Sequence, residues 1–269
     1  LYQRKLDLRT GKIVAVEGLL RWQHPDLGPV SPQVFVPIAE RTGFITEIGD
    51  WVLRAACLQA KQWLDDGLAI CVAVNLSAVQ LRSEQFVGRL SEILAEVGIP
   101  ARYLELEVTE TAVMADLEGA GRQLHELRRI GALIAIDDFG TGYSSLSYLK
   151  RFAADTLKID GSFVADIAID PSDATLVAAI IAMAHRLGLQ AVAEGVETGA
   201  QLAQLRRLQC DAAQGYLFSP PVPAEQLLAL LKSDRSLVPP AETDIGPRRV
   251  QGTAARSKAG DRTGAGNAI

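Results

Sequence analysis

The sequence predicts an α/β fold, a closed (β/α)8 barrel of the TIM type with an antiparallel first strand. Eight short apolar stretches along the 269 residues have the length and composition of β-strands. Amphipathic stretches of helical period separate most of them, which favours parallel strands joined by right-handed crossovers. Eight such strands around one core suggest that the sheet closes into a barrel.

The predicted strands are mostly continuous apolar runs, the pattern expected where both faces of a strand are covered. In chain order they cover residues 2–8, 13–20, 69–76, 103–109, 133–138, 156–160, 190–196 and 212–218. Only four residues, Arg9 to Lys12, separate the first two strands, which is too few for a crossover helix. These two strands should therefore form a hairpin, so that the first strand runs antiparallel to its neighbour.

The predicted helices include residues 47–66, 84–97, 117–130 and 174–187. A glycine followed by an apolar residue stands after each of them, at Gly67, Gly98, Gly131 and Gly188. Glycine adopts the left-handed conformation that ends many helices without a steric penalty. Each of these glycines is expected to turn the chain back toward the sheet.

The composition changes near the C-terminus, which sets the predicted domain boundary. Residues 1–233 are predicted to form one barrel domain. From Asp234 onward Pro, Gly, Ala and charged residues dominate, so residues 234–269 are predicted to be a disordered tail. The chain opens on a strand-like stretch without an initiator Met, so we expect it to be part of a longer protein.

The bulk composition argues against several classes of protein. A net charge of −5 is unfavourable for binding a nucleic-acid polymer. The three cysteines lie far apart and form no CxxC motif, which indicates a reducing compartment and neither disulfides nor a zinc site. No apolar run is long enough to span a bilayer, so a cytoplasmic location is expected, with any membrane anchor lying upstream.

Polar residues stand at the ends of six predicted strands, where the mouth of a barrel carries its chemistry. They are Glu17, Asn75, Glu107, Asp137 with Asp138, Lys158 with Asp160, and Glu194. One acid in such a place is usually a helix cap or a surface ion pair. Several carboxylates at one rim repel each other, and divalent cations relieve that repulsion. Oxygen ligands of this kind favour Mg²⁺ or Mn²⁺.

The paired acids Asp137 and Asp138 require a bend in the predicted strand, because successive strand residues point to opposite faces. With the bend, one carboxylate can bridge two metal ions while its neighbour binds only the second. The sequence "GTGYSS" at 140–145 provides backbone freedom for a loop over the mouth. The alternative is an ordinary strand-to-helix turn with serine caps.

Seven motifs in one order resemble the EAL-type phosphodiesterases, which hydrolyse the bacterial messenger cyclic di-GMP. The motifs are "EGLLRWQHP" at 17–25, "VNLS" at 74–77, "LEVTE" at 106–110, "IDDFGTGYSSL" at 136–146, "LKID" at 157–160, "AEGVET" at 193–198 and "QGYLF" at 214–218. The resemblance runs from Tyr2 to about Lys232. It implies a (β/α)8 barrel with an antiparallel first strand, in agreement with the hairpin inferred above.

The resemblance also implies roles for individual residues. Glu17, Asn75, Glu107 and Asp137 would hold a first metal ion, and Asp137 would bridge to a second one bound by Asp138 and Glu194. Lys158 would position or activate the attacking water, with Glu194 as the other candidate base. Arg21 would clamp a phosphate, and Glu110 would anchor the loop after the paired acids. Gln3, Leu19, Asp160, Glu197, Gln214 and Tyr216 would contact the substrate.

The implied reaction opens cyclic di-GMP to linear 5′-pGpG with two Mg²⁺ or Mn²⁺ ions, and Ca²⁺ is expected to inhibit it. A homodimer through the segment after "DDFGTG" and an upstream sensor or GGDEF domain are further family expectations. The chain departs from the family pattern at Gly18, where alanine is usual, and at Arg4, where proline is usual.

Two other functions stay open at this stage. The first is a catalytically silent receptor for cyclic di-GMP, although such members typically lack metal ligands that this sequence retains. The second is a sugar hydrolase with Glu17 and Glu107 as acid and base. That function would leave Asn75, Lys158 and the paired aspartates without a role.

Overall fold

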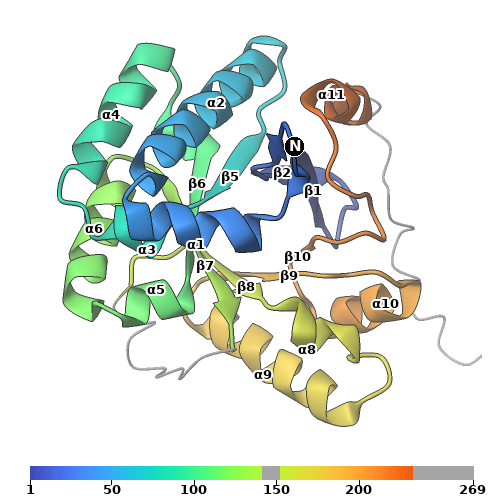
Figure 1. Ribbon diagram of the computed structural model, residues 1–269. Helices are drawn as coiled ribbons and strands as arrows, with labels where there is room; N and C mark the ends of the chain where they lie inside the picture. Colours follow the sequence, from blue (N-terminus) through green and yellow to red (C-terminus); the bar gives the residue numbers. More distant parts are fainter. Residues whose placement is uncertain (141–151, 233–269) are drawn as a thin grey trace, which may run out of the picture.

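The computed structural model describes residues 1–140 and 152–232 (Figure 1). Within these residues, eight strands close a barrel in the order β1-β10-β9-β8-β7-β6-β5-β2. The barrel strands are β1 (Tyr2–Asp7), β2 (Ile13–Gly18), β5 (Cys71–Asn75), β6 (Leu104–Thr109), β7 (Leu133–Phe139), β8 (Thr156–Ile159), β9 (Gln190–Ala193) and β10 (Ala212–Ala213). The predicted tail at 234–269 and residues 141–145 of the "GTGYSS" sequence lie outside the described residues.

The predicted barrel and its antiparallel first strand are both confirmed. β1 pairs antiparallel with β2 on one side and with β10 on the other. The remaining neighbours pair in parallel. Each of the eight predicted stretches overlaps one barrel strand, because short apolar runs separated by helices leave few other arrangements.

The last strand is much shorter than the predicted 212–218. β10 ends at Ala213, and the chain then turns toward the segment that follows β9. Val196 donates its amide to Gln214 O at 3.1 Å, and Leu217 donates to Val196 O at 2.9 Å. A Cβ at Gly215 would lie 2.1 Å from Val196 O, so only glycine permits this close approach.

Helices surround the barrel in the order expected for crossover connections (Figure 1). The helices described are α1 (Pro32–Thr42), α2 (Ile45–Asp65), α3 (Ala78–Leu81), α4 (Phe86–Val97), α5 (Glu110–Met114), α6 (Leu117–Arg129), α8 (Gly161–Ala165), α9 (Pro171–Arg186), α10 (Gly199–Arg207) and α11 (Ala224–Lys232), with a 3₁₀ turn at Ala101–Tyr103. The four predicted helices correspond to α2, α4, α6 and α9. The four glycines after them all have a positive φ, as predicted.

A small hairpin after β2 was not predicted. β3 (Trp22–His24) and β4 (Gly28–Val30) pair antiparallel outside the barrel, and α1 follows them. Strands of three residues are too short to leave a periodic pattern in the sequence. The insertion begins at the carboxyl end of β2, so it lies beside Glu17 and carries Arg21.

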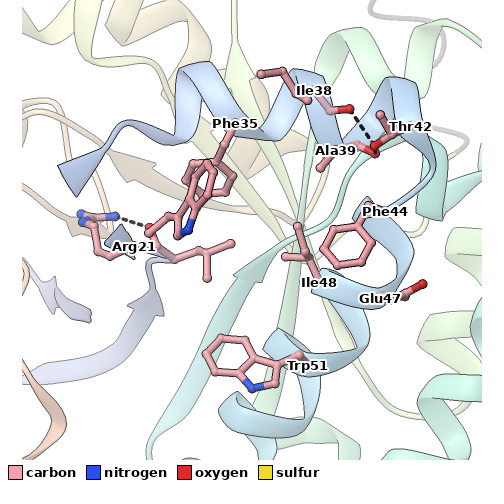
Figure 2. Close-up of a pocket in the computed structure, with 11 residues that line it drawn as sticks. Arg21, Phe35, Ile38, Ala39, Thr42, Phe44, Glu47, Ile48 and Trp51 are labelled. Carbon is pink, nitrogen blue, oxygen red and sulfur yellow. Dashed lines mark hydrogen bonds between the residues drawn. The ribbon is translucent and has the colours of Figure 1, made fainter. Parts of the chain in front are cut away.

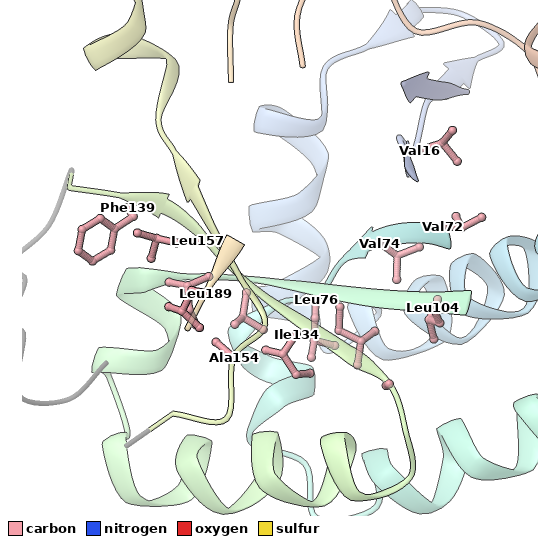
Figure 3. Packing of buried hydrophobic residues seen from close by; sticks show 14 of the residues in the cluster. Val16, Val72, Val74, Leu76, Leu104, Ile134, Phe139, Ala154, Leu157 and Leu189 are labelled. Atoms are coloured by element: carbon pink, nitrogen blue, oxygen red, sulfur yellow. The ribbon is translucent and has the colours of Figure 1, made fainter. Parts of the chain in front are cut away.

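The apolar core lies between the outer face of the barrel and the helices (Figure 3). Side chains alternate along each strand, so Leu104 and Leu106 of β6 face outward while Glu105 and Glu107 face the barrel interior. The interior therefore holds charged groups that contact one another across the barrel. Among the helices of the described residues, none is long and apolar enough to cross a membrane.

Candidate active site

Four of the polar residues predicted at the strand ends, Glu17, Asp137, Lys158 and Glu194, line one cavity of about 230 Å³ at the carboxyl end of the parallel strands. Its lining includes Gln3, Glu17, Asp137, Lys158, Glu194, Glu197, Gln214 and Tyr216. These residues come from β1, β2, β7 and β8 and from the segments that follow β9 and β10. The closure of the barrel is what brings residues so distant in sequence to one place.

Lys158 is the centre of the charged cluster. Its Nζ lies 2.7 Å from Glu107 Oε2, 2.6 Å from Glu194 Oε1 and 3.1 Å from Asp137 Oδ2. Only 1% of Lys158 is exposed. Burial alone would lower the pKa of this ammonium, but the surrounding carboxylates outweigh burial and raise the pKa well above its ordinary value. Lys158 therefore carries a positive charge at neutral pH.

A second group of polar contacts holds Glu17. Asn75 donates Nδ2 to Glu17 Oε1 at 2.8 Å, which leaves the amide oxygen of Asn75 available as a ligand. Gln214 donates Nε2 to Glu17 Oε2 at 2.6 Å and to Gln3 Oε1 at 3.0 Å. Residues on β1, β2 and β5, together with Gln214 after β10, therefore fix the position of this carboxylate.

The carboxylates differ in the direction of their pKa shifts. Burial raises the pKa of Glu17, of Asp137 and of Glu194, and neighbouring acids add to the effect. Burial would also raise the pKa of Glu107, but Lys158 and Lys5 outweigh it and lower the pKa to about 2. The site thus combines one strongly acidic carboxyl group with three that hold their protons more tightly.

The predicted bend between Asp137 and Asp138 is present. Asp138 has a φ of 53°, and the register between β7 and β8 shifts between Ile136 and Phe139. The bend brings Asp137, Asp138 and Glu194 together, so that one oxygen of each lies within 4.8 Å of the others. Three carboxylates at this spacing provide the hard oxygen donors that Mg²⁺ and Mn²⁺ prefer.

Glu110 and Asp160 flank the cluster. Glu110 is buried at the start of α5 and accepts a hydrogen bond from the amide of Gly140 at 3.2 Å, immediately before residues 141–151. Asp160 caps α8, because its Oδ1 accepts from the amide of Ser162 at 2.9 Å. Glu110 thus holds the end of β7, and the Asp160 carboxylate serves a helix cap.

Arg21 and Leu19 lie beside the charged cluster and not within it. Both line a small cavity of about 210 Å³ next to β2. Arg21 is exposed and donates Nη1 to Leu20 O at 2.8 Å. It also borders a larger apolar cavity of about 690 Å³ between the hairpin, α1 and the start of α2. Figure 2 shows Phe35, Phe44, Ile48 and Trp51 around this cavity.

Two residues of the barrel interior were not recognised in the sequence. Lys5 of β1 and Glu105 of β6 are buried, and Lys5 Nζ lies 2.5 Å from Glu105 Oε1 and 2.6 Å from Glu107 Oε1. In the sequence "YQRKLDL" Lys5 is one of two adjacent basic residues, and its spacing of two from Gln3 is the signal that could have shown that it faces inward. Glu105 stands two residues before Glu107, and this period of two is the signal that could have indicated it.

Comparison with known proteins decides the family. A family model described as the EAL domain matches residues 1–221. This chain belongs to the EAL domain family. This EAL domain is 48% identical over 229 residues to the bifunctional diguanylate cyclase/cyclic di-GMP phosphodiesterase MucR of Pseudomonas aeruginosa, covering 85% of this chain and 33% of MucR. It is 44% identical over 235 residues to the cyclic di-GMP phosphodiesterase NbdA of the same organism, covering 87% of this chain and 30% of NbdA. The chain spans a third or less of the length of these curated relatives.

Solved structures agree with this assignment. The structure of the PaMucR phosphodiesterase in its c-di-GMP complex matches with a TM-score of 0.81 at 48% identity, covering 84% of this chain and 92% of that chain. The EAL domain of Mycobacterium smegmatis DcpA matches with a TM-score of 0.74 at 39% identity, covering 87% of this chain and 95% of that chain. The barrel of this EAL domain is therefore the fold of the family.

Proposed function

We propose that this EAL domain hydrolyses one phosphodiester bond of cyclic di-GMP and releases linear 5′-pGpG, with two Mg²⁺ or Mn²⁺ ions as cofactors. The observation that carries the proposal is the junction at Lys158, where Glu107, Asp137 and Glu194 meet around one ammonium group. The relatives named as phosphodiesterases of the same messenger support the reaction class. Hydrolysis joins water to phosphorus and breaks one P–O bond, and the leaving ribose oxygen takes a proton.

The donor set at the mouth fits divalent cations. Asp137, Asp138 and Glu194 offer three oxygens at close range, and Glu17, Asn75 and Glu107 offer more nearby. When bound, such ions lower the pKa of a water molecule and neutralise charge on the phosphate. Removing the cations with a chelator should therefore abolish turnover, and Ca²⁺ should not replace them because its coordination is looser and its radius larger.

Glu194 is the better candidate for the base that accepts the proton of the attacking water. The high pKa of Lys158 keeps that side chain protonated, so it cannot take up another proton. Burial raises the pKa of Glu194 above its ordinary value, which makes this carboxylate a stronger base than an exposed one. In this proposal Lys158 stabilises the charge that develops on the phosphate oxygens, and it holds Glu194 in place at 2.6 Å.

The surroundings of the cluster suit a guanine dinucleotide. Gln3, Gln214, Glu197 and Tyr216 border the central cavity and are proposed to contact one nucleotide. We assign the phosphate clamp to Arg21, which stands four residues after Glu17. The apolar cavity that begins at Arg21 has aromatic walls that suit the planar face of a base. Dimerisation and upstream regulatory domains remain proposals by family resemblance.

The direct test is incubation of the purified chain with cyclic di-GMP and Mn²⁺, followed by chromatography for pGpG. The expected result is conversion that stops with a chelator or with Lys158→Met. A control variant, Lys61→Met on the exposed face of α2, should keep wild-type activity. Binding of intact cyclic di-GMP at saturating Mn²⁺ without pGpG would contradict hydrolysis and support the receptor function instead.

A further inference from the structure

A layer of buried polar side chains lies deeper in the barrel than the proposed metal ligands. Lys5 of β1, Glu105 of β6 and Thr156 of β8 form it, and each is at most 6% exposed. Glu105 Oε1 lies 2.5 Å from Lys5 Nζ, and Glu105 Oε2 accepts a hydrogen bond from Thr156 Oγ1 at 3.0 Å. The interior layers of such barrels are usually filled by branched apolar residues, so this polar layer needs an explanation.

Lys5 joins this layer to the mouth through Glu107. Its Nζ lies 2.6 Å from Glu107 Oε1, while the other oxygen of Glu107 lies 2.7 Å from Lys158 Nζ. Two lysines thus hold the two oxygens of the Glu107 carboxylate. Lys5 contacts Oε1 from the deeper layer of the barrel, and Lys158 contacts Oε2 at the rim. The contact with Lys5 fixes the rotation of the carboxylate and directs Oε2 toward the cavity.

Stability alone does not account for the buried pair of Lys5 and Glu105. Replacing a buried ion pair by apolar residues of similar volume is often neutral or stabilising, because two charges must lose their hydration. Groups that orient a metal ligand from behind, by contrast, commonly affect metal affinity by one to two orders of magnitude. The hydrogen bonds of the Glu105 side chain go to Lys5 and Thr156, neither of which is a proposed metal ligand, so any effect of Glu105 on the metal site passes through Lys5.

We propose that Lys5, balanced by Glu105, is a positioning residue that orients Glu107 for binding of the divalent cation. The inference rests on the proposed function only in taking Glu107 as a ligand. It assigns a role to the buried basic residue of β1 and to the first glutamate of "LELEVTE". Neither residue touches the substrate cavity, so neither is a catalytic residue.

The test is a charge-neutral double variant, Lys5→Met with Glu105→Gln. It removes one positive and one negative charge together, and the new glutamine can still accept from Thr156. Mn²⁺ binding is measured by calorimetry without substrate, and folding is checked by thermal melting. We expect the affinity for Mn²⁺ to fall about tenfold or more while the cooperative melting transition is kept. The matched control is Lys61→Met with Asp65→Asn, the same charge change at an exposed pair on α2, which should leave Mn²⁺ affinity unchanged.

The outcomes separate this inference from the proposed function. If the wild-type chain binds Mn²⁺ and the folded double variant binds it equally well, the positioning role is wrong and the proposed function is untouched. If the wild type binds no divalent cation, both fail. Should the double variant not fold, a crystal structure of the wild type with Mg²⁺ decides. Lys5 Nζ must then remain within about 3.2 Å of Glu107 while that carboxylate contacts the ion, and a longer separation overturns the inference.

Discussion

At the residue scale, the chemistry of the site follows from crowding charged groups in a space that excludes water. Lys158 stays charged because three carboxylates surround it, and Glu107 stays ionised because two lysines contact it. Glu17, Asp137 and Glu194 have raised pKa values because no partner fully compensates their burial. One protein interior therefore produces acids of very different strength within a single cluster.

The first prediction concerns Asp137, which contacts Lys158 and lies in the cluster with Asp138 and Glu194. Asp137→Asn keeps the shape of the side chain but removes the charge. Turnover of cyclic di-GMP should fall by about 100-fold or more, because the proposed cation site loses a ligand. The melting temperature should stay within about 3 °C of wild type, since the residue lies at the rim.

The control is Asp26→Asn in the exposed turn between β3 and β4, which should have no effect on either measurement. Loss of the fold in Asp137→Asn would show that the residue is structural.

The second prediction concerns pH and Glu194. Burial raises the pKa of Glu194 from 4.5 to about 8 in the folded, metal-free chain. A group whose folded pKa is raised binds its proton more tightly in the folded state. Its stabilising effect is complete below pH 4.5 and is lost as the pH rises through 8. In the presence of EDTA, the melting temperature should therefore decrease between pH 5 and pH 8. Glu194→Gln, which cannot titrate, should show a flatter decrease across this window. Equal slopes for the two proteins would contradict the assignment of this titration to Glu194.

At the element scale, four helices, α2, α4, α6 and α9, are each followed by a glycine at positive φ that reverses the chain. Gly98 has a φ of 71°, and a Cβ at this position would meet no atom within 4 Å. The cost of any other residue there is therefore purely conformational. A substitution at Gly98 therefore measures the energetic cost of the turn conformation without any change in side-chain packing.

The third prediction uses two glycines of the same element. Gly98→Ala, at the end of α4, should lower the free energy of unfolding by about 1 kcal/mol, because alanine is disfavoured at positive φ. Gly88→Ala, inside α4 with open space around its Cα, should raise it by about 0.5–1 kcal/mol. Urea denaturation of both variants gives the two changes. An unchanged or raised free energy of unfolding in Gly98→Ala would show that the turn after α4 does not require glycine.

The elements also show what the sequence could and could not predict. The barrel strands were found because a strand covered on both faces leaves a continuous apolar run, as in β7. The polar ends of those runs located Glu17, Glu107 and Asp137 at the mouth, since parallel strands end at one rim. The hairpin of β3 and β4 was missed because three residues carry no measurable period. The role of Lys5 was missed because its partners lie 100 residues or more away along the chain, and only closure of the barrel brings them together.

At the scale of the whole molecule, the number of paired residues between neighbouring strands differs around the barrel. β6 and β7 share five residue pairs, whereas β10 shares two with β1 and two with β9. The seam at β10 joins the antiparallel first strand to the last parallel one. Gln214 crosses this seam, because it contacts Glu17 of β2 and Gln3 of β1 immediately after β10. The weakest closure of the barrel is thus adjacent to the proposed substrate site.

The last prediction follows from that arrangement. Amide hydrogens of residues 211–214 should exchange about tenfold faster than those of 133–138 in the free protein, because fewer ladder bonds must open. Addition of cyclic di-GMP with Ca²⁺ should slow exchange at 211–214 more than at 133–138, since a ligand held by Gln3, Glu17 and Gln214 bridges the seam. Hydrogen–deuterium exchange followed by mass spectrometry measures both segments in one experiment. Gln214→Ala should remove the ligand-dependent part of the protection. Equal protection of the two segments in the free protein would mean that the seam at β10 is not the weakest closure. Ligand protection confined to 133–138 would mean that binding does not act on this seam.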